Sequence, residues 1–404
     1  MKKTHFSAST SDQGPLEQIR KDERPSLAEL FLAFLRLGLT AFGGPAMVAY
    51  IGDLSVKRKK WLDQRTFRRG VGLCQTIPGA TAMQTAAYVG LKTRGVPGAL
   101  FTFIGFGLPA FALMIILAYL YVTAGNPLWM RALFNGLQVV VVALIANATY
   151  TFGKQTVRNY TNAFIAGLSA LVFWVGVSPF YVILGAAVAG VLLMKQEKYG
   201  DLEEGGHLVI SLSHLITLII VVLSGIACLY FLRRDLFRLA LLMIKIDFFA
   251  FGGGFASVPL MLQEIVNVRG WMDNKVFMDG IALGQITPGP IVITSTFVGY
   301  LLYRLPGAIV ATVAIFTPSF LLVVSVAGFF GRLNRSVYFR KAVTGIFASF
   351  VGLLLYVTVK FAFAVPWDIV RVIIACATLV ALFKKVDILY IVPGAALLGV
   401  LLFR

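Results

Sequence analysis

The chain has 404 residues, of which 58% are hydrophobic and only 13% are charged. An average soluble protein carries about 25% charged residues, and a single soluble core cannot bury so many apolar side chains. The composition therefore excludes a soluble enzyme, a DNA-binding protein and a disordered chain. It predicts an all-α polytopic membrane protein that is embedded in a lipid bilayer.

The net charge is +18, from 36 Lys and Arg against 18 Asp and Glu. The cations lie mainly in short loops between apolar segments, as expected for a protein of the inner (plasma) membrane whose basic loops face the cytoplasm. No nucleic-acid partner is indicated. The three cysteines are scattered and the three histidines do not cluster, so we expect no disulfide framework, no metal site and no cofactor.

Residues 1–26 are polar and carry no secretory signal, so we predict a cytoplasmic N-terminal tail. Thirteen apolar segments follow in the order six, one, six, and most are near the ~20 residues that a spanning helix needs. They fall at about 27–56, 70–91, 97–122, 132–153, 159–177 and 179–194, then at 208–231, and then at 236–265, 279–302, 306–330, 342–364, 369–383 and 387–403.

The two sets of six segments repeat each other. A shift of 209 or 210 residues superposes Gly, Pro, Trp and Gln residues that apolar composition alone would not match. The pairs include Trp61 with Trp271, Gln75 with Gln285, Pro78 with Pro288, Gly90 with Gly299, Pro97 with Pro306, and Pro109 with Pro318. We predict a first repeat over 27–194, a connector with one transmembrane helix over 195–235, and a second repeat over 236–404.

The extra crossing between the repeats predicts that the second repeat is inverted relative to the first. Loop charges agree, because the strongly basic loop 57–69 has a mixed counterpart at 266–279. A basic pair, Arg233-Arg234, falls on the non-cytoplasmic side in this scheme. Whether segments 27–56 and 70–91 span the membrane or re-enter stays open, although their central Gly and Pro residues favour re-entrant hairpins.

Two motifs occur once in each repeat and interrupt an apolar segment. Broken helices at matching places of inverted repeats mark the substrate site of many transporters, and a helix that restarts after the break offers free N–H groups to an anion. The predicted substrate-binding residues are Gly43, Gly44, Pro45, Gln75, Thr76, Pro78 and Gly79 in the first repeat and Gly252, Gly253, Gly254, Gln285, Thr287, Pro288 and Gly289 in the second, with Thr81, Gln84, Thr85, Thr294, Ser295 and Thr296 as further donors. The alternative is that the Gly and Pro residues only permit close helix packing.

Two cations lie inside apolar segments. Arg36 and Lys245 each stand six residues before a Phe-Gly-Gly run and superpose at the 209 shift. Because a cation in such a segment costs roughly 2.5–3.5 kcal/mol on insertion scales, we add both residues to the predicted substrate site, where they would face a dianion. The alternatives are snorkelling to the interface or a structural pair such as Lys245 with Asp247.

The acids of the apolar segments are few. Asp53, Asp247 and Glu264 are candidates for proton coupling, and the alternative for each is an interfacial or paired residue. No cluster of acids and histidines indicates an enzyme, and no Gly-x-x-x-x-Gly-Lys-Ser/Thr run indicates ATP-driven transport. The interpretation is a secondary carrier that works by alternating access, with the two halves rocking about a central site.

At these motifs the sequence resembles the chromate ion transporter (CHR) family in its long, two-domain form. The resemblance rests on Phe42–Pro45, Gln75–Ala80, Phe251–Gly254 and Gln285–Pro290, and it covers nearly the whole chain beyond residue 26. It implies a carrier that exports chromate from the cytoplasm with the proton-motive force and gives chromate resistance, with sulfate as the expected competitor. The alternative is a carrier or channel for sulfate or another oxyanion. Transport direction, coupling ion and oligomeric state, a homodimer included, are left open by the sequence.

Overall fold

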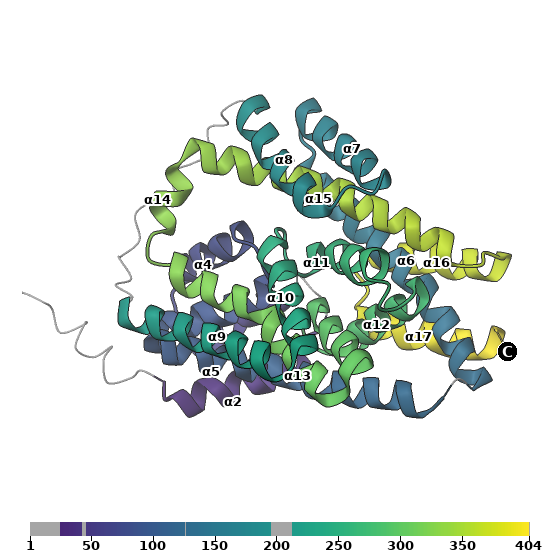
Figure 1. Cartoon of the computed structure of the whole chain (residues 1–404), viewed down its shortest axis with the longest axis horizontal. Coiled ribbons are helices and arrows are strands. Elements are labelled where there is room, and N and C mark those ends of the chain that lie inside the picture. Colours follow the sequence, from purple (N-terminus) through teal and green to yellow (C-terminus); the bar gives the residue numbers. More distant parts are fainter. Residues whose placement is uncertain (1–24, 43–45, 126, 195–211, 404) are drawn as a thin grey trace, which may run out of the picture.

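The computed structural model describes residues 25–42, 46–125, 127–194 and 212–403, and every regular element in these ranges is a helix (Figure 1). In chain order the helices are α2 (Leu27–Thr40), α3 (Ala46–Gly52), η1 (Asp53–Arg58), α4 (Gln64–Thr76), α5 (Thr81–Thr123), α6 (Leu128–Thr156), α7 (Tyr160–Trp174), α8 (Pro179–Leu193), α9 (Leu212–Leu232), α10 (Arg234–Phe249), α11 (Gly254–Met261), η2 (Leu262–Val268), α12 (Asn274–Ile286), η3 (Ile291–Ile293), α13 (Thr294–Val326), α14 (Phe330–Arg335), α15 (Val337–Ala364), α16 (Ile369–Phe383) and α17 (Ile388–Leu402).

Five stretches of the described chain are long and apolar enough to cross a membrane. They are Thr81–Thr123, Leu128–Thr156, Ser213–Leu232, Ile291–Val326 and Val337–Ala364. The shorter helices α7, α8, α16 and α17 are also apolar. The protein is therefore a helical polytopic membrane protein.

The predicted segment 27–56 forms a helical hairpin instead of one continuous helix. The residues that follow the segment return to its first part, because Lys59 Nζ lies 2.8 Å from Glu29 Oε1 and the Phe34 ring stacks on Trp61 with 6.4 Å between ring centroids. The break lies where the Phe-Gly-Gly-Pro motif was predicted to interrupt the helix. Gly43, Gly44 and Pro45 themselves are outside the described residues.

The predicted segment 70–91 also doubles back. Asp63 caps α4 by accepting a hydrogen bond from the Thr66 amide, and this bond lowers the pKa of Asp63. The chain turns at Pro78-Gly79 and returns as the first arm of α5, so that Thr81 Oγ1 lies 3.4 Å from the Cys74 carbonyl oxygen. Segment 70–91 is therefore shared between two helices.

A second reversal divides α5 itself. Arg94 and Gly95 leave helical geometry, and Thr102 Oγ1 donates to the Ala86 carbonyl at 2.8 Å although 16 residues separate them. Gly90 and Gly98 allow the two arms to touch, since a Cβ on Gly90 would lie 2.2 Å from the Gly98 carbonyl oxygen.

The second half of the chain repeats these elements. Asp273 caps α12 through the Val276 amide, and the reversal inside α13 falls at Tyr303 and Arg304, 209 residues after Arg94 and Gly95. The π-helical segment η2 likewise corresponds to η1. The backbone reversals thus fall at equivalent positions in the two halves.

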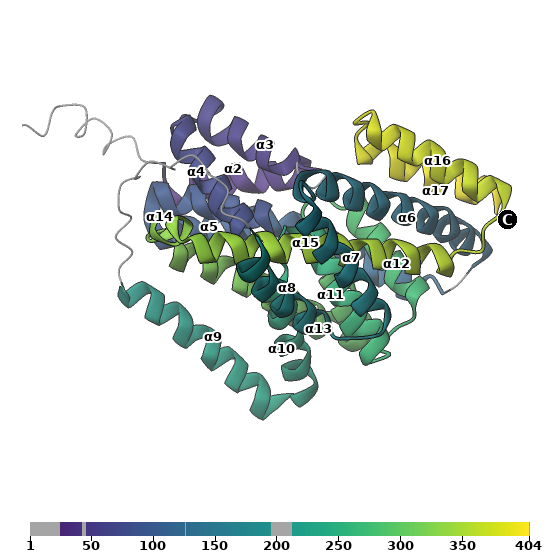
Figure 2. The ribbon, with the colours of Figure 1, turned by 90° about the horizontal axis from the view of Figure 1, so that it is seen from above.

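The helices pack into two groups that do not follow the two halves of the sequence. We call α2–α5 and α10–α13 the hairpin body, and α6–α8 with α15–α17 the scaffold body. In the scaffold body, α7 and α8 of the first half pack on α15 of the second, whereas α16 and α17 pack on α6 (Figures 1 and 2). Gly190 approaches Gly345, and Gly399 approaches Gly136 in the same way. Because each body contains elements of both halves, rocking of two separate halves does not fit this fold.

Candidate functional site

The Pro-Gly motif of each half contacts the residue just before the Phe-Gly-Gly motif of the opposite half. The Gly79 amide donates to the Ala250 carbonyl at 2.9 Å, and the Gly289 amide donates to the Ala41 carbonyl at 3.0 Å. Ala41 and Ala250 are the C-cap residues that directly follow α2 and α10. Gly79 and Gly289 have φ values of +118° and +116°, a left-handed backbone that favours glycine. The Pro-Gly turns therefore anchor one half on the helix break of the other.

Three helix N-termini converge beside these turns. They belong to α5, α11 and η3, which begin at Thr81, Gly254 and Ile291. A Cβ on Gly253 would lie 3.1 Å from Thr81 Oγ1, and a Cβ on Gly254 would lie 3.0 Å from Ile291 Cγ2. Helix N-termini carry unpaired N–H groups and a partial positive charge, so their convergence creates a place that favours an anion.

The predicted polar side chains of the site differ in their availability. Thr76 and Thr287 donate to carbonyl groups of their own helices, Gly72 and Gly284, so these hydroxyl hydrogens are engaged. Gln75 is exposed at the end of α4.

Its counterpart Gln285 is half-buried, and its Nε2 is buried without a hydrogen-bond partner, as is Ser295 Oγ. Buried donors normally have partners, so these two groups are the unsatisfied donors among the predicted site residues of the second half.

The remaining predicted residues shape the turns. Pro78 and Pro288 are buried at the two tips, and the Pro78 carbonyl accepts from Gln84 Nε2 at 2.6 Å. Gly252, with φ +101°, packs against the Phe152 ring of α6. These contacts fix the backbone path that brings the helix N-termini together.

Arg36 and Lys245 occupy different environments despite their equivalent positions. Lys245 Nζ lies 3.1 Å from Glu264 Oε1 and 3.6 Å from the centroid of the Phe180 ring on α8. Its partner is therefore Glu264, and the alternative pair with Asp247 does not form. Glu264 also pairs with Arg269. The charge of Lys245 is thus already compensated.

The guanidinium of Arg36 is exposed and makes no ion pair or hydrogen bond with the described residues. The position equivalent to Glu264 in the first half is Ser55, whose hydroxyl donates to the Ile51 carbonyl at 2.7 Å. The first half therefore has no acid at this place. Of the two cations, Arg36 is the one without an acidic partner among the described residues.

The three candidates for proton coupling also differ in whether their charge is paired with a cation. Asp53 pairs with Arg58 at 2.6 Å and with Lys57 at 3.7 Å, and Glu264 is paired as described above. Asp247 is fully buried and lies beside no cation among the described ion pairs. It is the candidate whose charge is not compensated.

A relay of hydrogen bonds joins Asp247 to the first Pro-Gly turn. Asp247 Oδ2 accepts from the Ser319 amide at 2.9 Å and from the Ser319 hydroxyl at 2.7 Å, and Ser319 Oγ accepts from the Ala80 amide at 2.8 Å. Asp247 Oδ1 is buried without a partner. Sequence reasoning missed Ser319, which is one residue after the repeated Pro318 and is replaced by Ala110 in the first half.

Sequence reasoning also treated Asp279 as a loop charge. It lies in α12 and is 6% exposed. Its Oδ2 accepts from the Tyr121 hydroxyl at 2.9 Å, and its Oδ1 accepts from Gln138 Nε2 at 2.8 Å. The sequence feature that could have indicated its burial is its place at the beginning of a predicted apolar segment.

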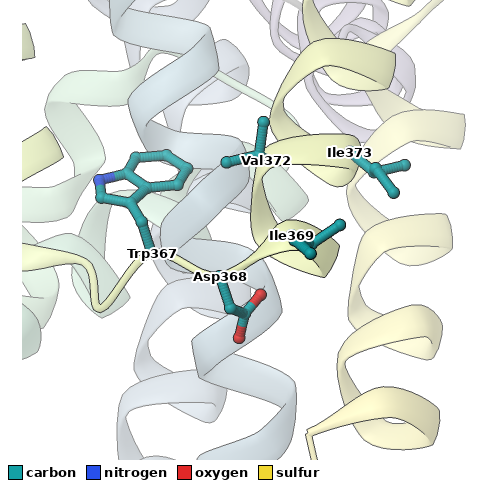
Figure 3. A pocket seen from close by; sticks show the side chains of 5 residues that line it. All are labelled: Trp367, Asp368, Ile369, Val372 and Ile373. Carbon is teal, nitrogen blue, oxygen red and sulfur yellow. The ribbon is translucent and has the colours of Figure 1, made fainter.

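A surface pocket lies elsewhere, at the beginning of α16. It is lined by Trp367, Asp368, Ile369, Val372 and Ile373 (Figure 3). The Asp368 carboxylate caps α16 and pairs with Arg371. A carboxylate among apolar side chains does not favour an anion, and this pocket contains no predicted site residue.

The chain matches a family model twice, over residues 28–191 and 237–400, and the description of that family is chromate transporter. The chain belongs to the chromate transporter family. Members of this family are transport proteins, so the chain is a membrane transport protein and not an enzyme.

Several relatives match over nearly their whole length. An uncharacterized transporter of Methanocaldococcus jannaschii is 40% identical over 390 residues, which are 96% of this chain and 97% of that protein. The chromate transport protein of Cupriavidus metallidurans is 31% identical over 390 residues, 94% of each chain. A probable chromate transport protein of Synechococcus elongatus is 30% identical over 382 residues, 93% of this chain and 95% of that protein. No solved structure matches the chain.

Proposed function

We propose that this protein is a secondary active transporter that exports chromate across the inner membrane by alternating access and thereby gives chromate resistance. The observation that carries the proposal is the convergence of the N-termini of α5, α11 and η3 beside the two Pro-Gly turns, in a family whose relatives include chromate transport proteins. Sulfate, a dianion of the same shape, is the expected competitor.

The chemistry of the site suits a tetrahedral dianion. Backbone N–H groups at helix N-termini donate to oxyanions without bringing a full charge, and the amide of Gln285 adds a donor. Arg36 adds a guanidinium, whose planar donors match an oxyanion. In this proposal Arg36 binds the anion directly, whereas Lys245 holds Glu264 and the hairpin that contains it.

The orientation of the repeats is part of the proposal. Two equivalent residues, Thr149 and Thr358, contact each other at 3.0 Å, as residues beside a two-fold axis do. The paired bonds from Gly79 to Ala250 and from Gly289 to Ala41 have the same symmetry. These contacts, the single helix α9 between the repeats and the basic loop 57–69 support inverted repeats with a cytoplasmic N-terminus. The moving units are then the hairpin body and the scaffold body.

The proton-motive force is the proposed energy source. An inside-negative potential of 100 mV favours exit of a dianion by about 4.6 kcal/mol, since each charge contributes about 2.3 kcal/mol. Asp247 is the proposed coupling group. Its carboxylate connects through Ser319 to the turn beside the anion site, so that a proton on Asp247 removes a negative charge near the bound anion.

The test is chromate flux in a host that lacks its own chromate exporters. Cells expressing the protein should accumulate less chromium and grow at higher chromate concentrations than cells with empty vector. Everted vesicles from these cells should take up chromate faster when energised. Equal accumulation in both strains, or uptake of sulfate without uptake of chromate, would contradict the proposed substrate.

A further inference from the structure

Asp279 is a buried acid between the two bodies of the fold. Its helix, α12, belongs to the hairpin body and packs against α6, α15 and α17 of the scaffold body. One carboxylate oxygen accepts from Tyr121 on α5, and the other accepts from Gln138 on α6. The carboxylate therefore has one partner in its own body and one across the boundary.

No cation in the described part of the chain pairs with Asp279. On its own segment the charged neighbours are Asp273 and Lys275, near the beginning of α12. The packed elements α5 and α6 present the Tyr121 hydroxyl and the Gln138 amide.

Two charged groups on the other elements packed against α12 are bonded elsewhere. Lys360 of α15 bonds to Asn267, and Glu264 of η2 pairs with Lys245 and Arg269. Neutral groups alone thus hold the Asp279 carboxylate.

In the first half, the helix that corresponds to α12 is α4, and it is placed differently. α12 is mostly buried, whereas α4 packs mainly against α5 and exposes Gln64, Arg65 and Arg68. At the 210 shift Asp279 corresponds to Arg69. The same hairpin is therefore docked on the scaffold body in one half only, and the acid is present in the docked hairpin only.

We propose that Asp279 is a proton-binding site whose proton uptake is linked to movement of the hairpin body on the scaffold body. Separation of the bodies removes Gln138 from the carboxylate and leaves Tyr121. A group that loses a hydrogen-bond partner in one conformation binds protons with different affinity in the two conformations, and linkage then requires that protons shift the balance between them. This inference rests on the proposed transport function and adds a proton site distinct from Asp247.

The partners of Asp279 suit both protonation states. A tyrosine hydroxyl donates or accepts, and a glutamine side chain presents either its amide nitrogen or its oxygen after rotation. A protonated Asp279 can therefore donate to either group after that group reorients. Ion-paired acids such as Glu264 lack this property, because protonation would leave Lys245 and Arg269 without their counter-charge.

The experiment uses the purified full-length protein in proteoliposomes and measures counterflow of radiolabelled chromate at equal pH on both sides, over a range of pH. Counterflow by the wild type tests the proposed function, and its pH dependence tests Asp279. We expect Asp279→Asn to retain counterflow but to lose at least half of the wild-type pH dependence. Asp368→Asn, an exposed acid of the scaffold body, is the matched control and should keep the wild-type profile. A wild-type profile in Asp279→Asn overturns the proposal.

Two further variants keep the test informative if Asp279→Asn does not fold. Tyr121→Phe and Gln138→Leu each remove one hydrogen bond from the ionised carboxylate and leave the acid in place. We expect the midpoint of the pH profile to move toward alkaline pH by about one unit in each variant. Unchanged midpoints in both contradict the proposal.

A readout without transport separates this inference from the substrate assignment. Hydrogen–deuterium exchange of residues 274–286 is compared at about pH 5 and about pH 8, with α16 as the internal reference for the chemical effect of pH. The wild type should show a change in α12 protection relative to α16 that Asp279→Asn lacks. If α12 protection changes equally in the wild type and in Asp279→Asn, the proposal is overturned even if chromate is transported. If the wild type transports no chromate but shows the expected exchange difference, only the substrate assignment is contradicted.

Discussion

Neutralising Arg36 should weaken anion binding far more than neutralising Lys245. The two residues are equivalent in the repeat, but Lys245 is bound to Glu264 and stacked on Phe180, whereas Arg36 is exposed without an acidic partner among the described residues. A symmetric pair of anion-binding cations would make the two substitutions equally harmful. The structure predicts a large difference.

The magnitude follows from the contacts. A hydrogen bond to a charged group contributes about 1.5–3 kcal/mol, and each 1.4 kcal/mol is tenfold in affinity, so Arg36→Gln should raise the KM for chromate about 10- to 100-fold. Lys245→Gln leaves Glu264 with Arg269 as a partner. We therefore expect its KM to change less than about threefold, with a loss of stability of about 1 kcal/mol as the main effect.

The assay is initial-rate uptake of radiolabelled chromate into everted vesicles over a range of concentrations, normalised to the amount of protein in the membrane. Lys384→Gln, which removes an exposed cation after α16, controls for the change in overall charge. A KM for Arg36→Gln within twofold of the wild type would refute direct anion binding by this residue. An equal rise in both variants would refute the assigned asymmetry.

Three other substitutions or labelling experiments test the architecture. Gly79→Ala should lower the melting temperature in detergent and reduce chromate flux at least tenfold. The reasons are that a left-handed backbone costs a non-glycine residue about 1–2 kcal/mol and that the new Cβ would lie 2.2 Å from Ser319 Oγ. The control Gly72→Ala, whose Cβ meets no atom within 4 Å, should change neither the melting temperature nor the flux. Ser319→Ala should destabilise the protein by about 1–3 kcal/mol through loss of its bonds to Ala80 and Asp247, measured as a lower melting temperature, and an unchanged melting temperature would argue against the relay. Single cysteines placed in 57–69 and in 266–279 should react with an impermeant thiol reagent from opposite faces of the membrane, and labelling from one face would contradict inverted repeats.

The sequence predicted the backbone turns better than it predicted the packing. Pro78, Gly79 and their counterparts control the local backbone through their own chemistry, so their repetition at a fixed shift located the turns in advance. The packing of α7 and α8 on α15 could not be predicted, because an apolar helix with a small residue such as Gly190 fits many partners. The exchange of helices between the halves therefore became visible only in three dimensions.

Side-chain partners were the least predictable part of the site. Lys245 lies two residues from Asp247 in the sequence, yet its partner is Glu264, across the hairpin. Asp279 was counted with the loop 266–279 because its partners on α5 and α6 are remote from it in the sequence. Ser319 gained its role from the Pro-Gly turn of the opposite half, 239 residues away. Such contacts depend on the tertiary arrangement and leave no periodic signal.

Counterflow by the purified protein tests the central claim most directly. Proteoliposomes loaded with unlabelled chromate, and diluted into a trace of radiolabelled chromate, should accumulate the label transiently above its equilibrium level, and excess sulfate should reduce this accumulation. Liposomes without protein should show none. Failure of the protein to accumulate labelled chromate, under conditions in which it accumulates labelled sulfate or in which it is shown to be folded, would contradict the account.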